Sequence, residues 1–218
     1  MCASLTALEE EIQALESAGI DSIHIDIMDG HFVPNLTFGP DMVKAVRSTT
    51  TLPLHVHLMV SEPSWILAPM AEAGCDVCIF HVEADRYPYR LVKKISDLGM
   101  APGIAVNPAT PIDAAAGFDV PYVLVMTVEP GFVGQKWLPA SVDRISRVRD
   151  FTSPGTVIGV DGNVSLPNAR LAAAVGASLF VCGTSVLFGA DRDYRTAVGA
   201  LRAALGTGET ELVAGGAP

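Results

Sequence analysis

Short apolar segments alternate with amphipathic segments along nearly the whole chain, and this alternation limits the possible folds more than any other feature. The apolar segments are rich in Val, Ile and Leu, as expected for strands that are buried on both faces of a parallel sheet. The segments between them have the apolar spacing of helices. We predict strands at residues 22–27, 54–58, 77–80, 103–106, 122–126, 157–160 and 179–182, and helices at residues 6–18, 40–47, 65–73, 89–98, 112–116, 141–150, 167–175 and 194–205.

Strands and helices in regular alternation predict a (β/α)8 barrel, the TIM-barrel fold of the α/β class. The remaining strand has only residues 1–5 available to it, so we expect a short or truncated first strand. A seven-stranded open sheet is the structural alternative. No linker interrupts residues 1–205, which predicts a single barrel domain. Residues 206–218 are small, polar and rich in Gly, as is typical of a flexible C-terminal tail.

The composition argues against several classes of protein. The formal net charge of −10 and the pI near 4.8 disfavour nucleic acid as a partner. No apolar run reaches the ~18 residues that a membrane span needs, and no signal peptide is visible. Cys75 and Cys78 have the spacing of a zinc or redox pair, but no second pair accompanies them. We therefore interpret them as buried structural cysteines and expect a cytoplasmic protein.

Polar residues gather at the carboxyl ends of the predicted strands, where (β/α)8 barrels carry their active sites. His24 and Asp26 are two positions apart on one strand, so they point to the same face. His57 lies on the next strand, and Asp161 follows the strand at residues 157–160. Each His alone is more often a core residue than a ligand. As a set, two imidazoles and two carboxylates predict one divalent metal ion, with Zn, Mn, Fe and Co all suitable.

Glycine-containing turns follow three of the later predicted strands. Gly131 and Gly134 belong to G-F-V-G, Gly162 belongs to D-G-N, and Gly183 belongs to G-T-S. Barrels commonly bind phosphate at the loops after their last two strands. Backbone N–H groups can bind an anion even in an acidic protein. Together, the three turns predict a site for a phosphorylated small molecule.

Five motifs resemble those of the ribulose-phosphate 3-epimerase family. The longest, H-I-D-I-M-D-G-H-F-V-P-N-L-T-F-G-P, begins at His24, and H-L-M-V begins at His57. N-P-A-T-P, V-M-T-V-E-P-G-F-V-G-Q-K and V-D-G follow in the order and spacing of the family. The resemblance covers roughly residues 5–205. It implies a (β/α)8 barrel of the ribulose-phosphate-binding type with one divalent metal ion.

The resemblance implies a metal-dependent 3-epimerase that interconverts D-ribulose 5-phosphate and D-xylulose 5-phosphate through an enediolate. Asp26 and Asp161 would exchange the C3 proton on the two faces of the sugar, because a single base cannot easily reach both faces. His24, Asp26, His57 and Asp161 would be the metal ligands. Relatives assemble as dimers or hexamers, so a homo-oligomer is expected. The implied substrate-binding residues are His57, Gly131, Phe132, Val133, Gly134, Asp161, Gly162, Asn163, Gly183 and Thr184, with Met28, Met59 and Met126 lining the pocket.

The chain departs from the family pattern in three places. The family usually has a substrate-contacting Ser on strand one, before the part of that strand that this sequence would contain. His55 stands where the family often has Asp, and we expect it to form a supporting hydrogen bond rather than to bind the metal. Val133 and Asn163 replace glycines beside the predicted phosphate loop.

Three alternative functions remain open. The residue Asn163 and the G-T-S ending are similar to the allulose-6-phosphate branch of the family, so D-allulose 6-phosphate and D-fructose 6-phosphate are an alternative substrate pair. An inactive phosphosugar-binding relative is the second alternative. An aldolase or decarboxylase on the same barrel is the third. A Schiff-base aldolase needs an inward lysine on a strand, whereas the lysines lie on predicted helices or in a loop, at Lys44, Lys93, Lys94 and Lys136.

Overall fold

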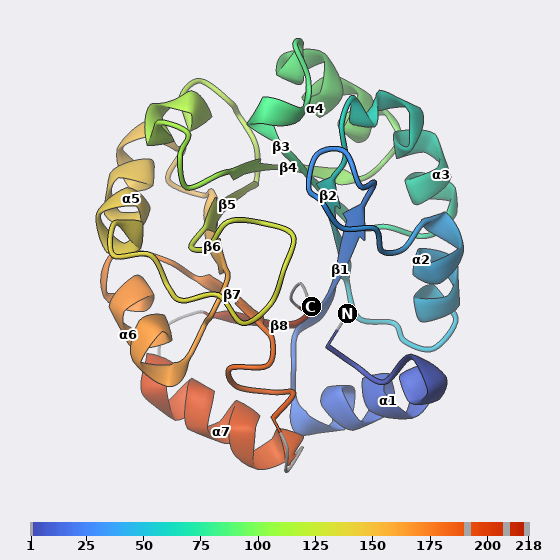
Figure 1. Ribbon diagram of the computed structural model, residues 1–218, viewed down its shortest axis with the longest axis vertical. Helices are drawn as coiled ribbons and strands as arrows, with labels where there is room; N and C mark the ends of the chain where they lie inside the picture. Colours follow the sequence, from blue (N-terminus) through green and yellow to red (C-terminus); the bar gives the residue numbers. More distant parts are fainter. Residues whose placement is uncertain (1, 190–192, 207–209, 216–218) are drawn as a thin grey trace.

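Eight parallel strands form a closed barrel in the computed structural model, and the helices surround it as an outer ring (Figure 1). The structure describes residues 2–189, 193–206 and 210–215. Each strand pairs with the next one along the chain, and the last strand also pairs with the first. The strands are β1 Ser22–Met28, β2 Leu54–Met59, β3 Val77–His81, β4 Ala101–Val106, β5 Tyr122–Met126, β6 Val157–Asp161, β7 Leu179–Cys182 and β8 Glu211–Ala214.

Helices connect most of these strands. No helix in the described part of the chain is long and apolar enough to cross a membrane. The predicted helix at residues 112–116 is instead the 3-10 helix Ile112–Ala115, because Gly117 turns the chain soon afterwards with a φ of 81°. Short 3-10 helices also occur at Leu5–Ala7, Pro63–Trp65, Val82–Ala84 and Arg149–Phe151. The α-helices are α1 Leu8–Ala18, α2 Pro40–Arg47, α3 Leu67–Glu72, α4 Pro88–Asp97, α5 Ser141–Val148, α6 Leu166–Ala174 and α7 Tyr194–Leu205.

Apolar side chains fill the space on both sides of the barrel wall. Strand residues are buried almost throughout, because one face of each strand points into the barrel and the other packs on helices. The outer cluster contains Phe80 and Phe180, which are both fully buried. The inner cluster consists of Val77, Ile79, Ala105, Leu124, Met126, Leu179, Val181 and Val213.

The seven strands predicted from the sequence are confirmed, but the predicted first strand at residues 1–5 is wrong. Leu5–Ala7 forms a 3-10 helix, and the described residues before it belong to no strand. The place between β7 and β1 is occupied by β8, which pairs with both of them. The barrel therefore closes with a strand from the far end of the chain.

The prediction of a flexible tail over residues 206–218 is accordingly wrong for residues 211–214, and the barrel domain extends beyond residue 205. Leu212 and Ala214 pack in the outer apolar cluster, whereas Val213 belongs to the inner one. Burial on both faces holds this short segment as a strand. Residues 207–209 and 216–218 of the predicted tail lie outside the described residues.

The two cysteines with C-x-x-C spacing are both buried and not joined by a disulfide. The thiol of Cys75 donates to the carbonyl oxygen of Val77 at 3.2 Å, and Cys78 packs in the outer apolar cluster. These contacts agree with the structural interpretation of the pair.

Candidate active site

Four polar side chains from three strands meet inside the barrel near the carboxyl ends of the strands. His24 and Asp26 alternate with apolar residues on β1, so both project into the barrel. The parallel register places His57 of β2 beside Asp26, and Asp161 is the last residue of β6. One potential ligand atom from each of the four buried residues lies within 4.8 Å of the others. The structure thus brings together all four residues that the sequence assigned to a metal ion.

The contacts within this group, which we call the His–Asp cluster, join each imidazole to both carboxylates. Nδ1 of His57 lies 3.2 Å from Oδ1 of Asp26 and 3.6 Å from Oδ2 of Asp161. Nε2 of His24 lies 3.3 Å from the same Asp26 oxygen and 3.9 Å from the same Asp161 oxygen. Two nitrogens and two oxygens therefore face one another across one small space.

Burial and ion pairing act in opposite directions on the pKa values in this cluster. Burial alone would raise the pKa of Asp26, but the charge of His24 and hydrogen bonds from His24 and His57 lower it well below its usual range. Burial alone would lower the pKa of His57, but hydrogen bonds to Asp161 and Asp26 raise it to about 9. A proton on His57 therefore offsets the carboxylate charge when no cation is bound.

Three buried atoms of the cluster make no hydrogen bond of good geometry to the described residues, namely Nδ1 and Nε2 of His24 and Oδ2 of Asp26, although Nε2 of His24 lies near Oδ1 of Asp26. Buried polar atoms without a partner are rare and costly, so such atoms call for a ligand. A donor set of two imidazole nitrogens and two carboxylate oxygens suits a divalent transition metal. The residues present therefore fit the metal ion that the sequence predicted.

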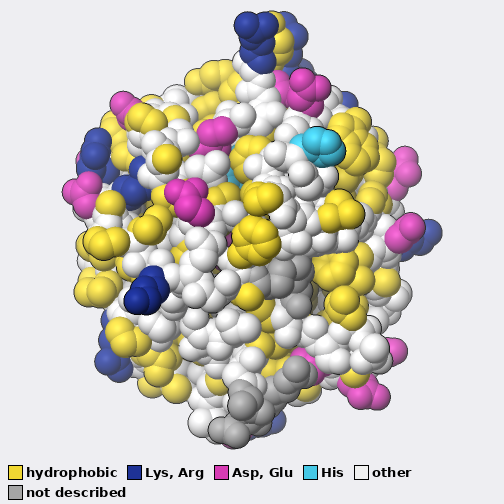
Figure 2. Space-filling model, viewed as in Figure 1, with side chains coloured by type: hydrophobic (Ala, Val, Ile, Leu, Met, Phe, Trp, Pro, Cys, Tyr) yellow, Lys and Arg dark blue, Asp and Glu magenta, His cyan; other side chains and the backbone are white. Residues whose placement is uncertain are grey.

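An open pocket lies beside the cluster, and Asp161 lies in its wall. The segments that follow β5, β6 and β7 form most of the wall. Its described lining residues include no Lys or Arg, and on this face of the molecule the basic side chains lie mainly toward the rim (Figure 2). The pocket is lined by the predicted residues Gly131, Phe132, Val133, Gly134, Gly162, Asn163, Gly183 and Thr184, and by Met59 and Met126.

Two predicted residues are placed differently from the rest. Met28 pairs in register with Met59 and packs in a small apolar cluster with Val33, but it lines a neighbouring groove rather than this pocket. His57 is fully buried and does not belong to the residues that line the pocket. The pocket wall therefore exposes one carboxylate of the cluster, that of Asp161, and leaves His57 behind it.

Comparisons with known proteins identify the family. The sequence profile of the ribulose-phosphate 3-epimerase family matches residues 1–187. The chain is 43% identical over 202 residues to the ribulose-phosphate 3-epimerase of Methanocaldococcus jannaschii, covering 90% of this chain and 85% of that protein. It is 41% identical over 198 residues to the Bacillus subtilis protein of the same name, covering 88% and 91%. This chain belongs to the ribulose-phosphate 3-epimerase family.

Solved structures with the same barrel are more distant in sequence. A 3-hexulose-6-phosphate synthase matches with a TM-score of 0.67 at 16% identity, over 92% of this chain and 94% of that one. An orotidine 5′-phosphate decarboxylase from Pyrococcus horikoshii OT3 matches with a TM-score of 0.65 at 17% identity, over 90% and 92%. At this level of identity the similarity shows the fold alone.

Asn163 connects three of the loops around the pocket. Its Nδ2 donates to the carbonyl oxygen of Gln135 at 2.7 Å, and its Oδ1 accepts from Oγ of Ser185 at 3.1 Å. Its own carbonyl oxygen accepts from Nδ2 of Asn168 at 2.8 Å. The residue adopts a left-handed φ of 49°, which Asn tolerates better than most residues. Its side chain thus holds the loops together in this member of the epimerase family.

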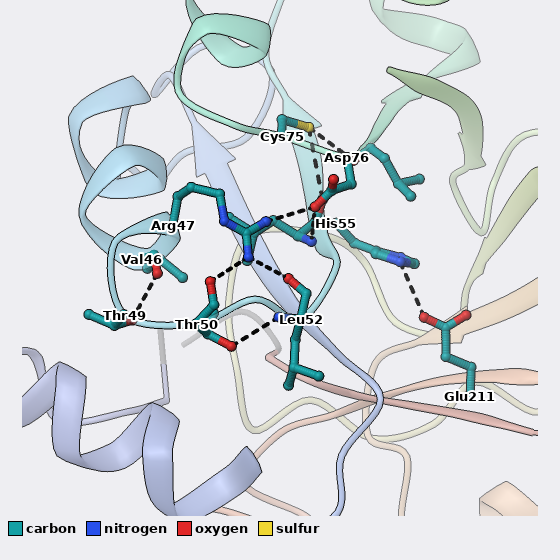
Figure 3. A network of polar contacts seen from close by, with 11 residues as sticks. Val46, Arg47, Thr49, Thr50, Leu52, His55, Cys75, Asp76 and Glu211 are labelled. Carbon is teal, nitrogen blue, oxygen red and sulfur yellow. Dashed lines mark hydrogen bonds and ion pairs between the residues drawn. The ribbon is translucent and has the colours of Figure 1, made fainter. Parts of the chain in front are cut away.

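His55, two positions before His57 on β2, lies deeper in the barrel than the His–Asp cluster. Its Nε2 is 3.2 Å from Oε1 of Glu211 on β8 (Figure 3). Oγ of Ser22 donates to the same carboxylate oxygen at 2.6 Å. Burial would raise the pKa of Glu211, but the hydrogen bond and charge of His55, with the bond from Ser22, lower it. The contact is with Glu211 and not with a metal-ligand candidate, so the supporting role expected for His55 stays a prediction.

Two further residues, His81 and Glu83, lie behind His57 and were not predicted from the sequence as part of the site. Nε2 of His81, at the end of β3, lies 2.8 Å from Nε2 of His57. Nδ1 of His81 lies 3.4 Å from Oε2 of Glu83, whose other oxygen accepts from the backbone N–H of Asn107 at 2.9 Å. F-H-V-E at the end of a predicted strand was a visible signal for both residues, but only the fold places them next to a metal ligand.

Proposed function

We propose that this chain is a metal-dependent 3-epimerase that interconverts D-ribulose 5-phosphate and D-xylulose 5-phosphate. One observation carries the proposal: two carboxylates, Asp26 and Asp161, share a buried site with two imidazoles beside an open pocket. Asp26 belongs to β1 and Asp161 to β6, and two other strands separate them around the barrel. Proton transfer on both faces of one carbon needs two such groups.

The reaction removes the C3 proton, which lies next to the C2 carbonyl, and returns a proton to the opposite face. His24, Asp26, His57 and Asp161 would hold a divalent ion, which would supply Lewis acidity beside the reacting carbon. Asp161 lines the pocket and accepts or donates the proton on one face. Asp26 serves the other face, and hydrogen bonds and charge from the two imidazoles keep it ionised.

The phosphate group binds at the loops that follow β5, β6 and β7, away from the reacting carbon. Gly131, Gly134, Gly183 and Thr184 offer backbone N–H groups there, and the described lining residues include no basic side chain. Binding energy from a remote phosphate orients the sugar so that C3 lies between the two carboxylates. Because the net charge of −10 repels an anionic substrate, local donors at these loops offset the repulsion.

The identity of the metal, the location and oligomeric state of the protein, and the length of its substrate are also part of the proposal. We propose Zn, Mn, Fe or Co as the metal, because all four accept mixed imidazole and carboxylate ligands. We further propose a cytoplasmic homo-oligomer, in keeping with its family. The six-carbon pair D-allulose 6-phosphate and D-fructose 6-phosphate is the alternative substrate, since Asn163 and Val133 change the shape of the pocket beside the phosphate loops.

The test is a direct assay on both candidate substrates. Metal-stripped protein is supplied in turn with each divalent ion and incubated with D-ribulose 5-phosphate or D-allulose 6-phosphate, and the products are quantified by NMR. We expect xylulose 5-phosphate to form, at a rate that depends on the added metal. Turnover of the six-carbon substrate alone would support the alternative. Binding of both sugars without turnover of either would show an inactive relative.

A further inference from the structure

The C-terminal segment 210–215 lies beyond the part of the chain that the family profile matches, yet it forms part of the barrel wall. Four residue pairs join β8 to β7, and two join it to β1. The backbone N–H of Leu212 donates to the carboxylate of Asp21 at 2.6 Å, and the carbonyl oxygen of Leu212 accepts from the Asp21 backbone at 2.9 Å. The segment is therefore fixed directly against the strand that carries two of the four metal-ligand candidates.

Glu211 is the first residue of β8 and places a carboxylate under the His–Asp cluster. Its Oε1 accepts from Oγ of Ser22 and lies 3.2 Å from Nε2 of His55. Ser22 and His55 are each two positions before a cluster residue, His24 and His57, and therefore share their inward face. Ser22 and His55 are almost completely buried, so losing their common acceptor would leave two polar groups unsatisfied in the barrel.

Gly215 ends the segment in direct contact with His24. A Cβ atom at position 215 would lie 2.5 Å from Cβ of His24 and 2.6 Å from its carbonyl oxygen. Both His24 atoms belong to the centre of a buried strand, so they cannot move aside without displacing the imidazole. The N–H of Gly215 donates to the carbonyl oxygen of Cys182 at 3.2 Å, which holds the glycine in place from the other side.

We propose that Glu211 and Gly215 are positioning residues for the metal site, so that the C-terminal strand sets the geometry of the His–Asp cluster as well as closing the barrel. Glu211 holds Ser22 and His55, which lie two positions before His24 and His57 on the same strands. Gly215 leaves the space that the His24 backbone requires. The inference rests on the proposed function only in that the cluster holds a divalent ion, and it extends the functional part of the chain to residue 215.

The decisive comparison is between Gly215→Ala and the matched control Gly199→Ala, measured on full-length, metal-stripped protein. Gly199 lies in α7, and a Cβ atom there would meet nothing within 4 Å. Co²⁺ is titrated into each protein while its visible absorption spectrum is recorded, and thermal unfolding of the metal-free forms is measured in parallel. The Co²⁺ spectrum reports the ligand geometry itself, which a change confined to folding stability would leave unaltered.

We expect Gly215→Ala to bind Co²⁺ about 10- to 100-fold more weakly than wild type, with an altered spectrum, as for other changes to residues that support metal ligands. Gly199→Ala should match wild type. Wild-type affinity and spectrum in Gly215→Ala would overturn the proposal. Failure of wild type to bind Co²⁺, Zn²⁺ or Mn²⁺ would overturn it too, because no metal site would then exist to be positioned.

A second pair of variants decides the question if Gly215→Ala does not fold. Glu211→Gln retains an oxygen that can accept from Ser22, whereas Glu211→Ala removes it. We expect Co²⁺ affinity to fall in Glu211→Ala and to be partly restored in Glu211→Gln. Equal affinity in wild type and Glu211→Ala would refute the inference. Metal binding without epimerase activity in wild type would refute the proposed function alone.

Discussion

His57 and His81 face each other inside the barrel, with their Nε2 atoms 2.8 Å apart and their rings stacked at an angle of 24°. Burial lowers the pKa of His81 to about 4, against the opposing effect of its hydrogen bond to the Glu83 carboxylate, so the ring is neutral at neutral pH. A neutral His81 that donates from Nδ1 to Glu83 accepts from His57 at Nε2. That arrangement turns the free electron pair of His57 Nδ1 toward Asp26 and Asp161, where a metal ion would bind.

His81→Phe should therefore weaken metal binding about 10- to 100-fold, because His57 loses the acceptor that fixes its tautomer. The change preserves a ring of similar size. Isothermal titration with Zn²⁺ measures the effect, and His31→Phe serves as the control because His31 is exposed. Unchanged Zn²⁺ affinity in His81→Phe would show that the contact between the two rings does not orient the ligand.

Asp161→Asn should remove one of the two proton-transfer groups and one metal ligand together. We expect the epimerisation rate to fall by a factor on the order of 10²–10⁴, the usual contribution of a positioned acid or base. Asp150→Asn is the matched control, since Asp150 is exposed and lies in the 3-10 helix Arg149–Phe151, outside the cluster. Activity near the wild-type level in Asp161→Asn, measured at saturating metal, would rule out the two-base mechanism.

Metal binding should release a proton at neutral pH. The pKa of His57 is raised from 6.5 to about 9 in the metal-free protein, and its nitrogen must lose the proton before it can bind a metal ion. Metal affinity should therefore rise by about tenfold per pH unit up to about pH 9 and then level off. Titrations at pH 7.5 in buffers of different ionisation enthalpy count the proton. An affinity that is independent of pH over this range would contradict the prediction.

The raised pKa of His57 makes the stability of the metal-free fold decrease with pH, whereas metal affinity increases. A protonated His57 stabilises the folded state fully below about pH 6.5, the pKa of an unperturbed imidazole. This contribution is lost as pH rises through about 9, the folded-state value. The melting temperature of the metal-free protein should therefore decrease as the pH rises from about 6.5 to about 9. His57→Gln should make the melting temperature less dependent on pH over this range.

Asn163→Ala should weaken the binding of the phosphorylated sugar more than it slows the chemical step. The substitution removes the bonds to Gln135 and Ser185 that join the loops of the pocket. We expect KM to rise about tenfold and kcat to change less, because each lost hydrogen bond costs about 1 kcal/mol. Asn163→Gly keeps the left-handed backbone accessible and separates the loss of the side chain from backbone strain. A wild-type KM in both variants would show that the loops need no such connection.

Arg47 should affect stability without affecting the metal site. Figure 3 shows its guanidinium between Asp76 and the carbonyl oxygens of Thr50 and Leu52, to which it donates at 2.9, 2.6 and 2.8 Å respectively. Arg47→Met keeps the aliphatic part of the side chain but loses these bonds. We expect a loss of about 1–3 kcal/mol in the free energy of unfolding, measured with urea, and an unchanged affinity for Co²⁺. A variant as stable as wild type would contradict the assigned role.

The sequence predicted those parts of the fold in which local pattern and tertiary environment agree. Apolar runs such as residues 54–58 are buried on both faces, so their composition alone marks them as strands. The segment Glu211–Ala214 has only four residues between Gly-rich stretches, and it is a strand because two neighbours already in the barrel supply its partners. Residues 1–5 were predicted as a strand only to complete a count of eight.

The candidate site also has parts that a local sequence pattern predicts and parts that depend on the tertiary fold. His24 and Asp26 could be predicted to share a face because the period of a strand is two residues. The contact between His57 and His81 depends on the register of β2 against β3, which no local pattern reveals. The contact of His55 with Glu211 was harder still to predict from the sequence, because it depends on β8 lying beside β1.

The measurement that tests the central claim most directly is the exchange of the C3 proton of D-ribulose 5-phosphate in D₂O, followed by NMR with metal-loaded protein. Two-base epimerisation through an enediolate predicts that deuterium from solvent appears at C3 of the xylulose 5-phosphate that forms. It also predicts that Asp161→Asn abolishes this incorporation. Formation of xylulose 5-phosphate with its C3 proton fully retained would contradict proton transfer by exchangeable carboxylates.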